Sequence, residues 1–281
     1  MTVLRTLVGT AALADHLDDP LWVVVDCRHD LLRPEAGRAG YANSHIPGAR
    51  FMHLDHDLAG PKTGTNGRHP LPDAASFAAK LGAAGIGAGT QVIAYDAQEG
   101  VNASRLWWML RWMGHDSVAV LDGGWPKWVE EQRPCTAVVP HPRPNTFRTS
   151  PGGGWVDTAY VISHLERQDM LIVDARSAQR FRGEAEPIDP VAGRIPGAVC
   201  RFFRDNLDAE GCFKPDAELR AEFQALLGAR SPGQAVHSCG SGVAACHNLL
   251  AMEIAGLAGG RLYPGSWSEW CADPARPIAR G

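Results

Sequence analysis

The sequence predicts an α/β fold of two tandem domains, each a mainly parallel sheet flanked by helices. Three observations support this prediction. Short β-branched runs alternate with helical segments, a set of landmarks recurs in the same order in the two halves, and a stretch rich in proline and glycine separates them. Strand–helix alternation implies right-handed crossovers and therefore parallel strands. The length of 281 residues accommodates two ordinary domains.

The N-terminal segment is expected to form a helix over residues 11–17, with Thr10 as its N-cap. Arg5 and the apolar run after it loosely imitate a signal peptide, but polar residues from Asp15 onward follow at once. No apolar stretch approaches the ~18 residues that would span a bilayer, so we expect no membrane partner. The seven cysteines are odd in number and scattered. They indicate reduced thiols and a cytoplasmic setting.

Further helices are expected over residues 76–81, 103–113, 217–227 and 244–254. Four landmarks recur in the two halves. The first is a strand ending in Asp-x-Arg (Asp26 and Arg28; Asp174 and Arg176), and the second is an Ile-Pro-Gly-Ala turn (from Ile46; from Ile195). The third is a strand end (Asp96; Cys239), and the fourth is a tryptophan after a glycine turn (Trp125; Trp267). We interpret the chain as a duplicated domain, over residues 1–134 and 155–281. Residues 135–154 are predicted to be a semi-rigid linker.

Composition and charge exclude some classes of function. The net charge is −4 and no basic run stands out, which argues against a protein that binds nucleic acid electrostatically. The sequence contains no Cys-x2-Cys pair, so a structural zinc site is not expected. The Asp-x-Arg motifs are interpreted as structural ion pairs.

Cys239 is the strongest candidate for a functional residue. It follows the apolar strand over residues 235–238 and precedes Gly240, Gly242 and an alanine-rich helix start. A strand, a tight glycine loop and a helix N-terminus form an anion cradle, because successive backbone N–H groups converge there and the helix dipole adds partial positive charge. A thiol in such a cradle is stabilised as the thiolate. The sequence therefore predicts a nucleophile.

Together these motifs resemble the rhodanese superfamily, specifically its two-domain sulfurtransferases, over nearly the whole chain. The resemblance implies that the second domain is catalytic and the first is a degenerate copy, with Asp96 at the position of the nucleophile. The loop from Cys239 to Ala245 is similar to the Cys-Gly-Ser-Gly-Val-Thr-Ala loop of 3-mercaptopyruvate sulfurtransferases. Thiosulfate-preferring rhodaneses instead carry Arg and Lys directly after the cysteine.

The resemblance implies a double-displacement reaction. The Cys239 thiolate takes sulfur from 3-mercaptopyruvate and forms a persulfide. A thiol, a thioredoxin-like protein or cyanide then removes the outer sulfur. Neither a metal nor an organic cofactor is required, and we expect a monomer. The persulfide is expected to be held by the backbone of the loop, namely Gly240, Gly242, Val243, Ala244 and Ala245.

By resemblance, Asp55, His69 and Ser241 handle protons around the thiol. Arg180 matches the first of two family arginines that hold the substrate carboxylate. The second would follow nine residues later, where this chain has Asp189. We expect Arg194 to compensate.

Three alternatives remain. Thiosulfate could be the donor. A cysteine phosphatase requires His-Cys-x5-Arg, but here Ser238 precedes the cysteine and Ala245 stands at the arginine position. A non-enzymatic module that binds or senses sulfur is the third alternative. We interpret Cys246 as a packing residue rather than a resolving thiol.

Overall fold

The computed structural model describes residues 3–165, 167 and 169–281, and the chain in it divides into two compact units. The first unit comprises the chain up to Gly60, Pro72–Gly153 and Glu210–Cys212, and the second comprises Pro61–Leu71, Gly154–Ala209 and Phe213–Gly281. Each unit contains its own sheet, and each is described by itself below.

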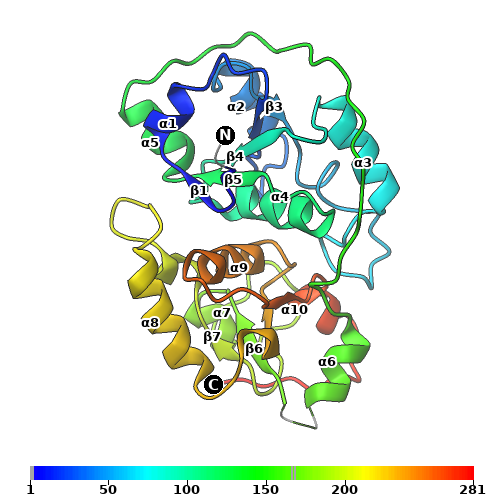
Figure 1. The fold of residues 1–281 in the computed structure, drawn as a ribbon. Coiled ribbons are helices and arrows are strands. Elements are labelled where there is room, and N and C mark those ends of the chain that lie inside the picture. The colour runs from blue at the N-terminus through cyan, green and yellow to red at the C-terminus, as the bar shows by residue number, and fades with distance from the viewer. Residues whose placement is uncertain (1–2, 166, 168) are drawn as a thin grey trace. The chain divides into compact units, whose positions relative to one another are not determined.

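The first unit contains a five-stranded sheet with the order β1-β5-β4-β2-β3, in which every pairing is parallel. Its strands are β1 (Leu7–Val8), β2 (Trp22–Asp26), β3 (Arg50–Phe51), β4 (Gln91–Tyr95) and β5 (Val118–Leu121). Its helices are α1 (Thr10–Ala14), α2 (Ala36–Asn43), α3 (Ala74–Ala83), α4 (Val101–Trp112) and α5 (Gly124–Glu130). Figure 1 shows these helices around the sheet.

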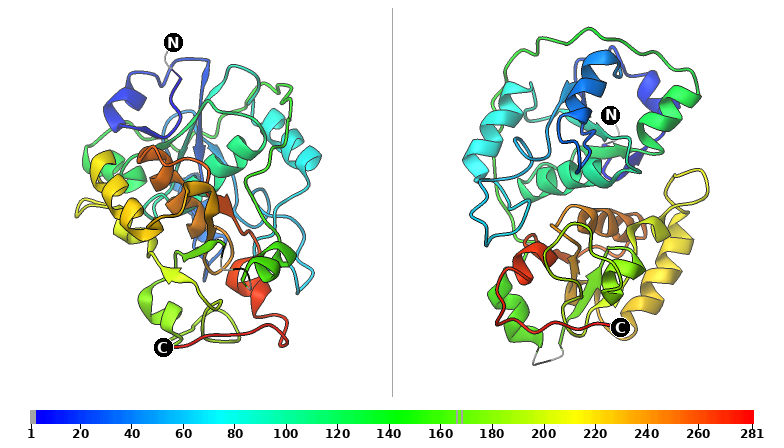
Figure 2. Two further views of the ribbon diagram at one scale, coloured as in Figure 1. Left: turned by 60° about the horizontal axis from the view of Figure 1, so that its bottom comes forward. Right: turned by 180° about the vertical axis from the view of Figure 1, so that it is seen from behind.

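The second unit contains a parallel sheet with the order β7-β6-β8-β9. Its strands are β6 (Leu171–Asp174), β7 (Val199–Cys200), β8 (Ala235–Ser238) and β9 (Arg261–Leu262). Its helices are α6 (Thr158–Leu165), α7 (Ala178–Arg182), α8 (Asp216–Leu227), α9 (Ala244–Ile254) and α10 (Ser266–Trp270), with the short 3-10 helices η1 (Phe203–Asn206) and η2 (Pro232–Gln234). Figure 2 shows the units from two further sides.

The two sheets repeat one topology. The strands β3, β2, β4 and β5 of the first unit correspond in order to β7, β6, β8 and β9 of the second. The edge strand β1 pairs in parallel with β5, and Trp155 forms the corresponding parallel bridge with Leu262 of β9. The predicted α/β fold with two similar parallel sheets is therefore confirmed.

The predicted helices lie within two residues of the observed ones, apart from the first. Helix α1 ends at Ala14, and its N-cap is Gly9 rather than Thr10. Thr10 is already helical and buried, and its hydroxyl donates a hydrogen bond to Glu131 at 2.5 Å. The threonine oxygen is therefore engaged with a distant carboxylate instead of with the first turn of its own helix.

The segment Pro61–Leu71 groups with the second unit, although it lies within the stretch expected to form the first domain. The backbone N–H of Arg68 donates to the hydroxyl of Ser268 at 3.0 Å, and His69 contacts Ser241. These contacts bind the segment to elements that follow it by about two hundred residues in sequence. They are the physical reason that this segment departs from the expected boundary.

The proline-rich stretch after α5 runs as an extended chain along the first unit and groups with it as far as Gly153 (Figure 1). Thr136 pairs with His45 in an antiparallel bridge. The N–H of Asn145 donates to the carbonyl of Gly82 in α3 at 2.8 Å, and the N–H of Ser150 donates to Met113 at 3.0 Å. Backbone hydrogen bonds spaced along the stretch therefore hold it in place.

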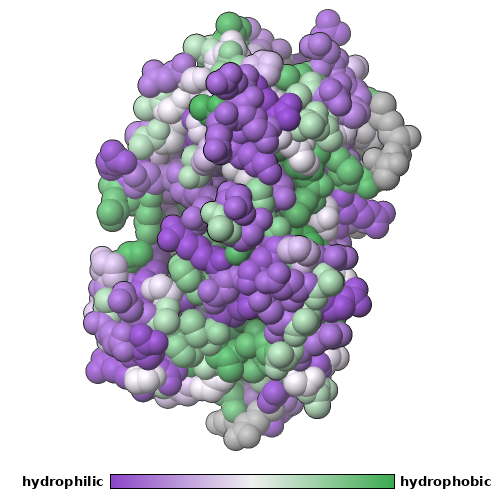
Figure 3. All heavy atoms as spheres, turned by 90° about the vertical axis from the view of Figure 1, so that its left-hand side faces the viewer, coloured by the Kyte–Doolittle hydropathy of each residue, from purple (hydrophilic) through white to green (hydrophobic). Residues whose placement is uncertain are grey.

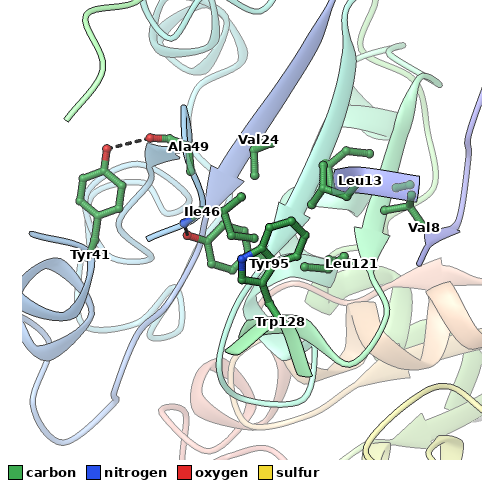
Figure 4. Packing of buried hydrophobic residues seen from close by; sticks show 11 residues of the cluster. Val8, Leu13, Val24, Tyr41, Ile46, Ala49, Tyr95, Leu121 and Trp128 are labelled. Atoms are coloured by element: carbon green, nitrogen blue, oxygen red, sulfur yellow. Dashed lines mark hydrogen bonds between the residues drawn. The ribbon is translucent and has the colours of Figure 1, made fainter. Parts of the chain in front are cut away.

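The hydrophobic core of the first unit lies between its sheet and the surrounding helices (Figure 4). Ile46, Tyr95 and Trp128 are all fully buried there. The phenol of Tyr95 donates to the carboxylate of Asp26 at 2.6 Å, so its polar end is satisfied inside the core. The corresponding cluster of the second unit includes the buried side chains Trp267 and Trp270.

The Asp-x-Arg motifs form buried ion pairs in both units, and in each the arginine lies over a tryptophan ring. Arg176 binds Asp174 with its Nη2 at 2.7 Å, donates to the carbonyl of Gly193 at 2.8 Å and lies over the ring of Trp267. In the first unit, Arg28 binds Asp26 at 2.6 Å and lies over the ring of Trp125. The predicted structural role of these motifs is confirmed.

Asp96 occupies the loop after β4, and its carboxylate is completely buried. Its Oδ1 accepts hydrogen bonds from the N–H groups of Gln98 and Gly100 at 2.8 and 2.9 Å. Its Oδ2 accepts from Asn102 and Ala103, in the first turn of α4, at 2.7 and 2.8 Å. The loop of the first unit is thus an anion cradle that is filled by the protein's own carboxylate.

The described helices do not include one that combines the length and the apolar run needed to cross a membrane. Figure 3 shows one face of the surface, where hydrophilic side chains predominate and hydrophobic ones form smaller areas. Leu32 and Val138 are among the most exposed large hydrophobic residues.

We expect Asp96→Asn to destabilise the protein. An amide offers one acceptor oxygen and turns its NH₂ group toward backbone N–H donors, so two buried amides lose their partner. The free energy of unfolding should fall by roughly 2–4 kcal/mol. Chemical denaturation followed by circular dichroism measures this loss. Asp18→Asn, an exposed position of the same unit, is the control and should be neutral. Equal stability of the two variants would contradict the cradle.

His237 makes stability depend on pH. It is fully buried in β8, its Nε2 lies 3.1 Å from the sulfur of Met252, and burial lowers its pKa to about 3. Because the unfolded chain binds this proton near pH 6.5, the folded state is favoured above that pH and loses stability as the pH falls toward 3. Between pH 7 and pH 4 the loss through this residue is about 3 kcal/mol.

The variant His237→Leu should therefore show a weaker fall in stability between pH 7 and pH 4 than the parent protein. The matched control is His141→Leu, at an exposed position, which should keep the parent's pH dependence. Denaturation curves at several pH values provide the measurement. A parallel fall in all three proteins would mean that other groups dominate acid unfolding.

Candidate functional site

Cys239 lies at the carboxyl end of β8, where a short loop leads into α9. Its side chain is buried, with 3% exposed. The sulfur accepts hydrogen bonds from the backbone N–H groups of Ser241 at 3.4 Å and Gly242 at 3.1 Å. Two amides directed at one sulfur favour a negative charge on it. The geometry of the predicted cradle is therefore present around this thiol.

Helix α10 is hydrogen-bonded to the cysteine loop. The N–H of Cys239 donates to the hydroxyl of Ser266 at 3.1 Å, and its carbonyl accepts from the N–H of Trp267 at 3.0 Å. The carbonyl of Gly240 accepts from Ser268 at 2.9 Å. Ser266 has a φ of 53°, uncommon for a residue with a side chain. Its hydroxyl also donates to the carbonyl of Tyr263, so one serine joins the loop to the turn before α10.

Gly242 is required by the shape of the loop. Its φ is +76°, and a Cβ at this position would lie 2.5 Å from the carbonyl oxygen of Pro264. Three residues after Asp96, Glu99 has a φ of 60°, so the loops of both units turn through the left-handed region at the same position. The second unit adds the close approach to Pro264, which excludes any side chain.

Ser241 connects the cysteine loop to His69. The Nδ1 of His69 lies 2.7 Å from the hydroxyl oxygen of Ser241, and both residues are buried. The backbone N–H of the same serine donates to the Cys239 sulfur. Three of the four expected catalytic residues are therefore brought together: the thiol, the hydroxyl and the imidazole.

Two arginine side chains lie over Gly240. A Cβ on this glycine would lie 2.7 Å from Nη2 of Arg68 and 3.4 Å from Nη2 of Arg180. Asp189 joins the two arginines: one of its carboxylate oxygens binds Nη1 of Arg68 and the other lies 3.1 Å from Nη2 of Arg180. Arg180 also binds Glu186 at 2.7 Å.

Arg68 is the residue of this site that the sequence analysis missed. The local signal that could have identified it is its position directly before His69. Asp189, expected only as a departure from the family pattern, is the carboxylate that binds Arg68.

The pKa values of the two carboxyl groups of this cluster shift in opposite directions. Burial raises the pKa of Asp189, with Glu186 adding to the effect and the two arginines opposing it. Burial also acts against the ionised form of Glu186, but its hydrogen bonds from Arg180 and the Asp189 amide outweigh this, and its pKa is lowered. Glu186 is therefore the firmly ionised partner of Arg180.

Two further expected site residues have contacts outside the cysteine loop. Asp55 belongs to the first unit, where its carboxylate lies 3.8 Å from the ring of His29. Arg194 donates to the carbonyl of Gly281 at 2.6 Å and lies over the ring of Phe181. The guanidinium of Arg194 is therefore bound to the C-terminal segment. That Arg194 compensates for Asp189 stays a prediction.

Two clusters of the first unit have donor atoms close enough to hold a metal ion. One is His29, His53 and Asp55, and the other is Glu35, His53 and His56. Both depend on His53, whose Nδ1 accepts from the N–H of Asp55 at 3.0 Å and whose Nε2 lies 3.1 Å from the carbonyl of Pro34. Both ring nitrogens of the shared ligand therefore already have hydrogen-bond partners. Neither cluster includes the cysteine loop.

The rest of the loop leads into α9. Val243 is the N-cap of this helix, Ala244 and Ala245 form its start, and the helix has no side-chain cap. Cys246 is fully buried, and its thiol donates to the carbonyl of Gly242 at 3.3 Å. That contact accords with the expected packing role.

Comparison with known proteins gives the following similarities. Residues 10–131 and 157–273 match the rhodanese-like domain. The chain is 46% identical over 278 residues to a probable 3-mercaptopyruvate sulfurtransferase of Pseudomonas aeruginosa, covering 98% of each chain. It is 34% identical over 292 residues to the thiosulfate sulfurtransferase of Bos taurus, covering 99% of this chain and 96% of that one.

Among solved structures, the chain is similar to the crystal structure of SseA from Escherichia coli, which is described among 3-mercaptopyruvate sulfotransferases. The TM-score is 0.81 and the sequence identity is 30%, with 94% of this chain and 99% of that chain covered.

We expect Gly242→Ala to be more disruptive than Gly197→Ala. Both glycines have a φ near +75°, but a Cβ on Gly197 would meet no atom within 4 Å, whereas one on Gly242 would meet Pro264. The strained φ should lower stability by about 1 kcal/mol in each variant. The clash with Pro264 should lower the stability of Gly242→Ala by about a further 2 kcal/mol and change the rate at which iodoacetamide alkylates Cys239. Equal effects in the two variants would show that the loop can shift.

Proposed function

Because the chain belongs to the family of rhodanese-like proteins, we propose that it is a sulfurtransferase that carries sulfane sulfur on Cys239. The observation that supports this most directly is the buried Cys239 sulfur held by two loop amides, with Ser241 and His69 beside it. The proposed donor is 3-mercaptopyruvate. The proposed acceptor is a thiol, a thioredoxin-like protein or cyanide.

The first unit supports the persulfide intermediate. A carboxylate on Cβ and a persulfide on Cβ both place a charged terminal atom two bonds beyond Cβ. Asp96 has this arrangement in the loop that corresponds to the cysteine loop, where four amides bind its oxygens. Asp96 is thus a built-in analogue of the anion that the loop around Cys239 would hold after the first half-reaction.

In the first half-reaction, the Cys239 thiolate attacks the sulfur of 3-mercaptopyruvate. The new S–S bond forms as the C–S bond breaks, and the electron pair of that bond leaves with pyruvate as its enolate, which takes up a proton. In the second half-reaction, the acceptor attacks the outer sulfur and the S–S bond breaks. The Cys239 thiolate is restored, and no external oxidant or reductant is required.

Ser241 and His69 are proposed to handle protons in this cycle. Ser241 belongs to the loop of the thiol, and its hydroxyl lies 2.7 Å from Nδ1 of His69. A hydrogen-bonded hydroxyl and imidazole can deliver a proton to the departing enolate or accept one from the incoming thiol. Asp55 remains a proposal from resemblance.

The choice of donor rests on charge. The loop after Cys239 is neutral, with Gly240, Ser241 and Gly242 in sequence. Thiosulfate is a dianion and gains most from additional cations, whereas 3-mercaptopyruvate is a monocarboxylate that one or two guanidinium groups can bind. Thiosulfate is the second candidate, since a relative at 34% identity is a thiosulfate sulfurtransferase.

Measuring kcat/KM for both donors decides between them, and a clear preference for thiosulfate would overturn the assignment.

The compartment is proposed from the cysteines. The structure describes all seven, none of them forms a disulfide, and five are buried. Reduced thiols are typical of a reducing compartment, so we propose a cytoplasmic setting.

We expect Cys239→Ser to abolish sulfur transfer. The parent protein treated with 3-mercaptopyruvate should gain the mass of one sulfur atom, and cyanide should remove it. The serine variant should gain none, because its hydroxyl is not ionised at neutral pH. Intact-protein mass spectrometry is the measurement. Cys135→Ser, at an exposed cysteine, should behave like the parent. If no donor adds sulfur to the parent protein, a binding or sensing module is favoured instead.

A further inference from the structure

Arg68 brings a second guanidinium to the cysteine loop from the segment Pro61–Leu71. Its Nη2 and the guanidinium of Arg180 both lie over Gly240, the residue after the nucleophile. Asp189 joins the two arginines, one carboxylate oxygen to each. The carboxylate that stands nine residues after Arg180 therefore does not leave Arg180 as a lone cation.

We propose that Arg68 is the second anchor for the carboxylate of the sulfur donor, and that Asp189 is the positioning residue that holds it over the loop. This inference rests on the proposed sulfurtransferase function and names the residues that select a carboxylate-bearing donor. It replaces the expectation that Arg194 supplies the second cation.

The hydrogen bonds of the cluster leave the loop-facing nitrogens available. Asp189 binds Nη1 of Arg68, while Glu186 binds Nε and Nη2 of Arg180. Among the contacts of the described residues, Nη2 of Arg68 and Nη1 of Arg180 make no hydrogen bond to the protein. Both nitrogens lie near the position of a Cβ on Gly240, at 2.7 and 3.5 Å. Two guanidinium N–H groups from different arginines can bind the two oxygens of one carboxylate.

The three charged side chains of this cluster are largely buried. The side chain of Arg68 is 23% exposed, that of Arg180 is 17% exposed, and that of Asp189 is 3% exposed. The Nε of Arg68 is buried without a hydrogen-bond partner among the described residues. The ion pair with Asp189 therefore leaves part of this guanidinium group without a partner, and a ligand carboxylate at Nη2 would satisfy another part of it.

A purely structural role is the alternative, in which Arg68 only fastens its segment to the second unit. Removing the arginine would then impair every donor equally. A donor-binding role predicts instead that the loss depends on the donor's own carboxylate. The analogue 1-mercapto-2-propanone has the same thiol and ketone as 3-mercaptopyruvate and lacks only the carboxylate.

The experiment compares both donors in the parent protein, Arg68→Ala and Arg68→Lys. With 3-mercaptopyruvate, we expect Arg68→Ala to lower kcat/KM by 10- to 100-fold, roughly, mostly through KM, and Arg68→Lys to lose less. With 1-mercapto-2-propanone, the change should stay below about threefold. Arg182→Ala is the control, since Arg182 lies in the same helix as Arg180 and pairs with Glu184 at the surface. Equal losses with both donors would overturn the proposal.

Exchanging the two charges tests the positioning role of Asp189. Arg68→Asp and Asp189→Arg should each lower kcat/KM for 3-mercaptopyruvate at least tenfold, because each leaves like charges side by side. The double variant restores an opposite-charge pair with the arginine at position 189, and it should recover to within about fivefold of the parent. A double variant no better than the poorer single variant would contradict the pairing.

Asp189→Asn should raise the KM for 3-mercaptopyruvate, and a lowered KM would mean that Asp189 competes with the donor.

Pyruvate binding separates this inference from the proposed reaction. If the parent protein turns over neither 3-mercaptopyruvate nor thiosulfate, the proposed function fails by itself. Calorimetric binding of pyruvate to the unmodified protein still tests the carboxylate anchor, because it needs no sulfur transfer. Arg68→Ala should weaken that binding at least tenfold relative to Arg182→Ala, and unchanged binding would overturn the proposal.

Discussion

The buried ion pair between Asp174 and Arg176 is the contact on which the geometry of the second unit depends. A buried pair is favourable only when its remaining polar groups are also satisfied. Here the guanidinium also donates to the carbonyl of Gly193 and lies over the ring of Trp267. It therefore joins the end of β6, the turn before Ile195 and helix α10. Because the N–H of Trp267 also binds the carbonyl of Cys239, the position of the thiol follows from that of the ion pair.

The same device in the first unit shows what the scaffold does independently of a thiol. Arg28 pairs with Asp26 and lies over Trp125, and the loop after β4 still converges its amides on an anion, the carboxylate of Asp96. The anion cradle is thus a property of the strand–loop–helix backbone. The side chain placed in it decides whether the loop is structural or reactive.

The sequence was sufficient for features set by local patterns. Helix α9 begins and ends where the alanine-rich run predicts, and the turn around Cys239 follows from two glycines and a helix start. The contact between Arg68 and Asp189 joins residues 121 positions apart, and no local pattern encodes it. The contacts of Arg194 could not be read from a local pattern for a similar reason, since they are made with the C-terminal segment at Ala279 and Gly281. A turn motif shows where a residue lies along the chain, but not which distant backbone group its side chain will bind.

The pairing of Arg68 with Asp189 bears on donor choice through charge. Two arginines with Glu186 alone would carry a net charge of about +1, and adding Asp189 brings the cluster near neutrality while keeping both guanidinium groups over the loop. A dianion gains roughly twice as much as a monoanion from each added positive charge, so a neutral cluster disfavours thiosulfate more than a monocarboxylate. Directional hydrogen bonds do not depend on the net charge in this way. The neutral cluster therefore attracts anions only weakly in general, but its two guanidinium groups can still bind the two oxygens of one carboxylate. Of the two proposed donors, 3-mercaptopyruvate is the one with a carboxylate.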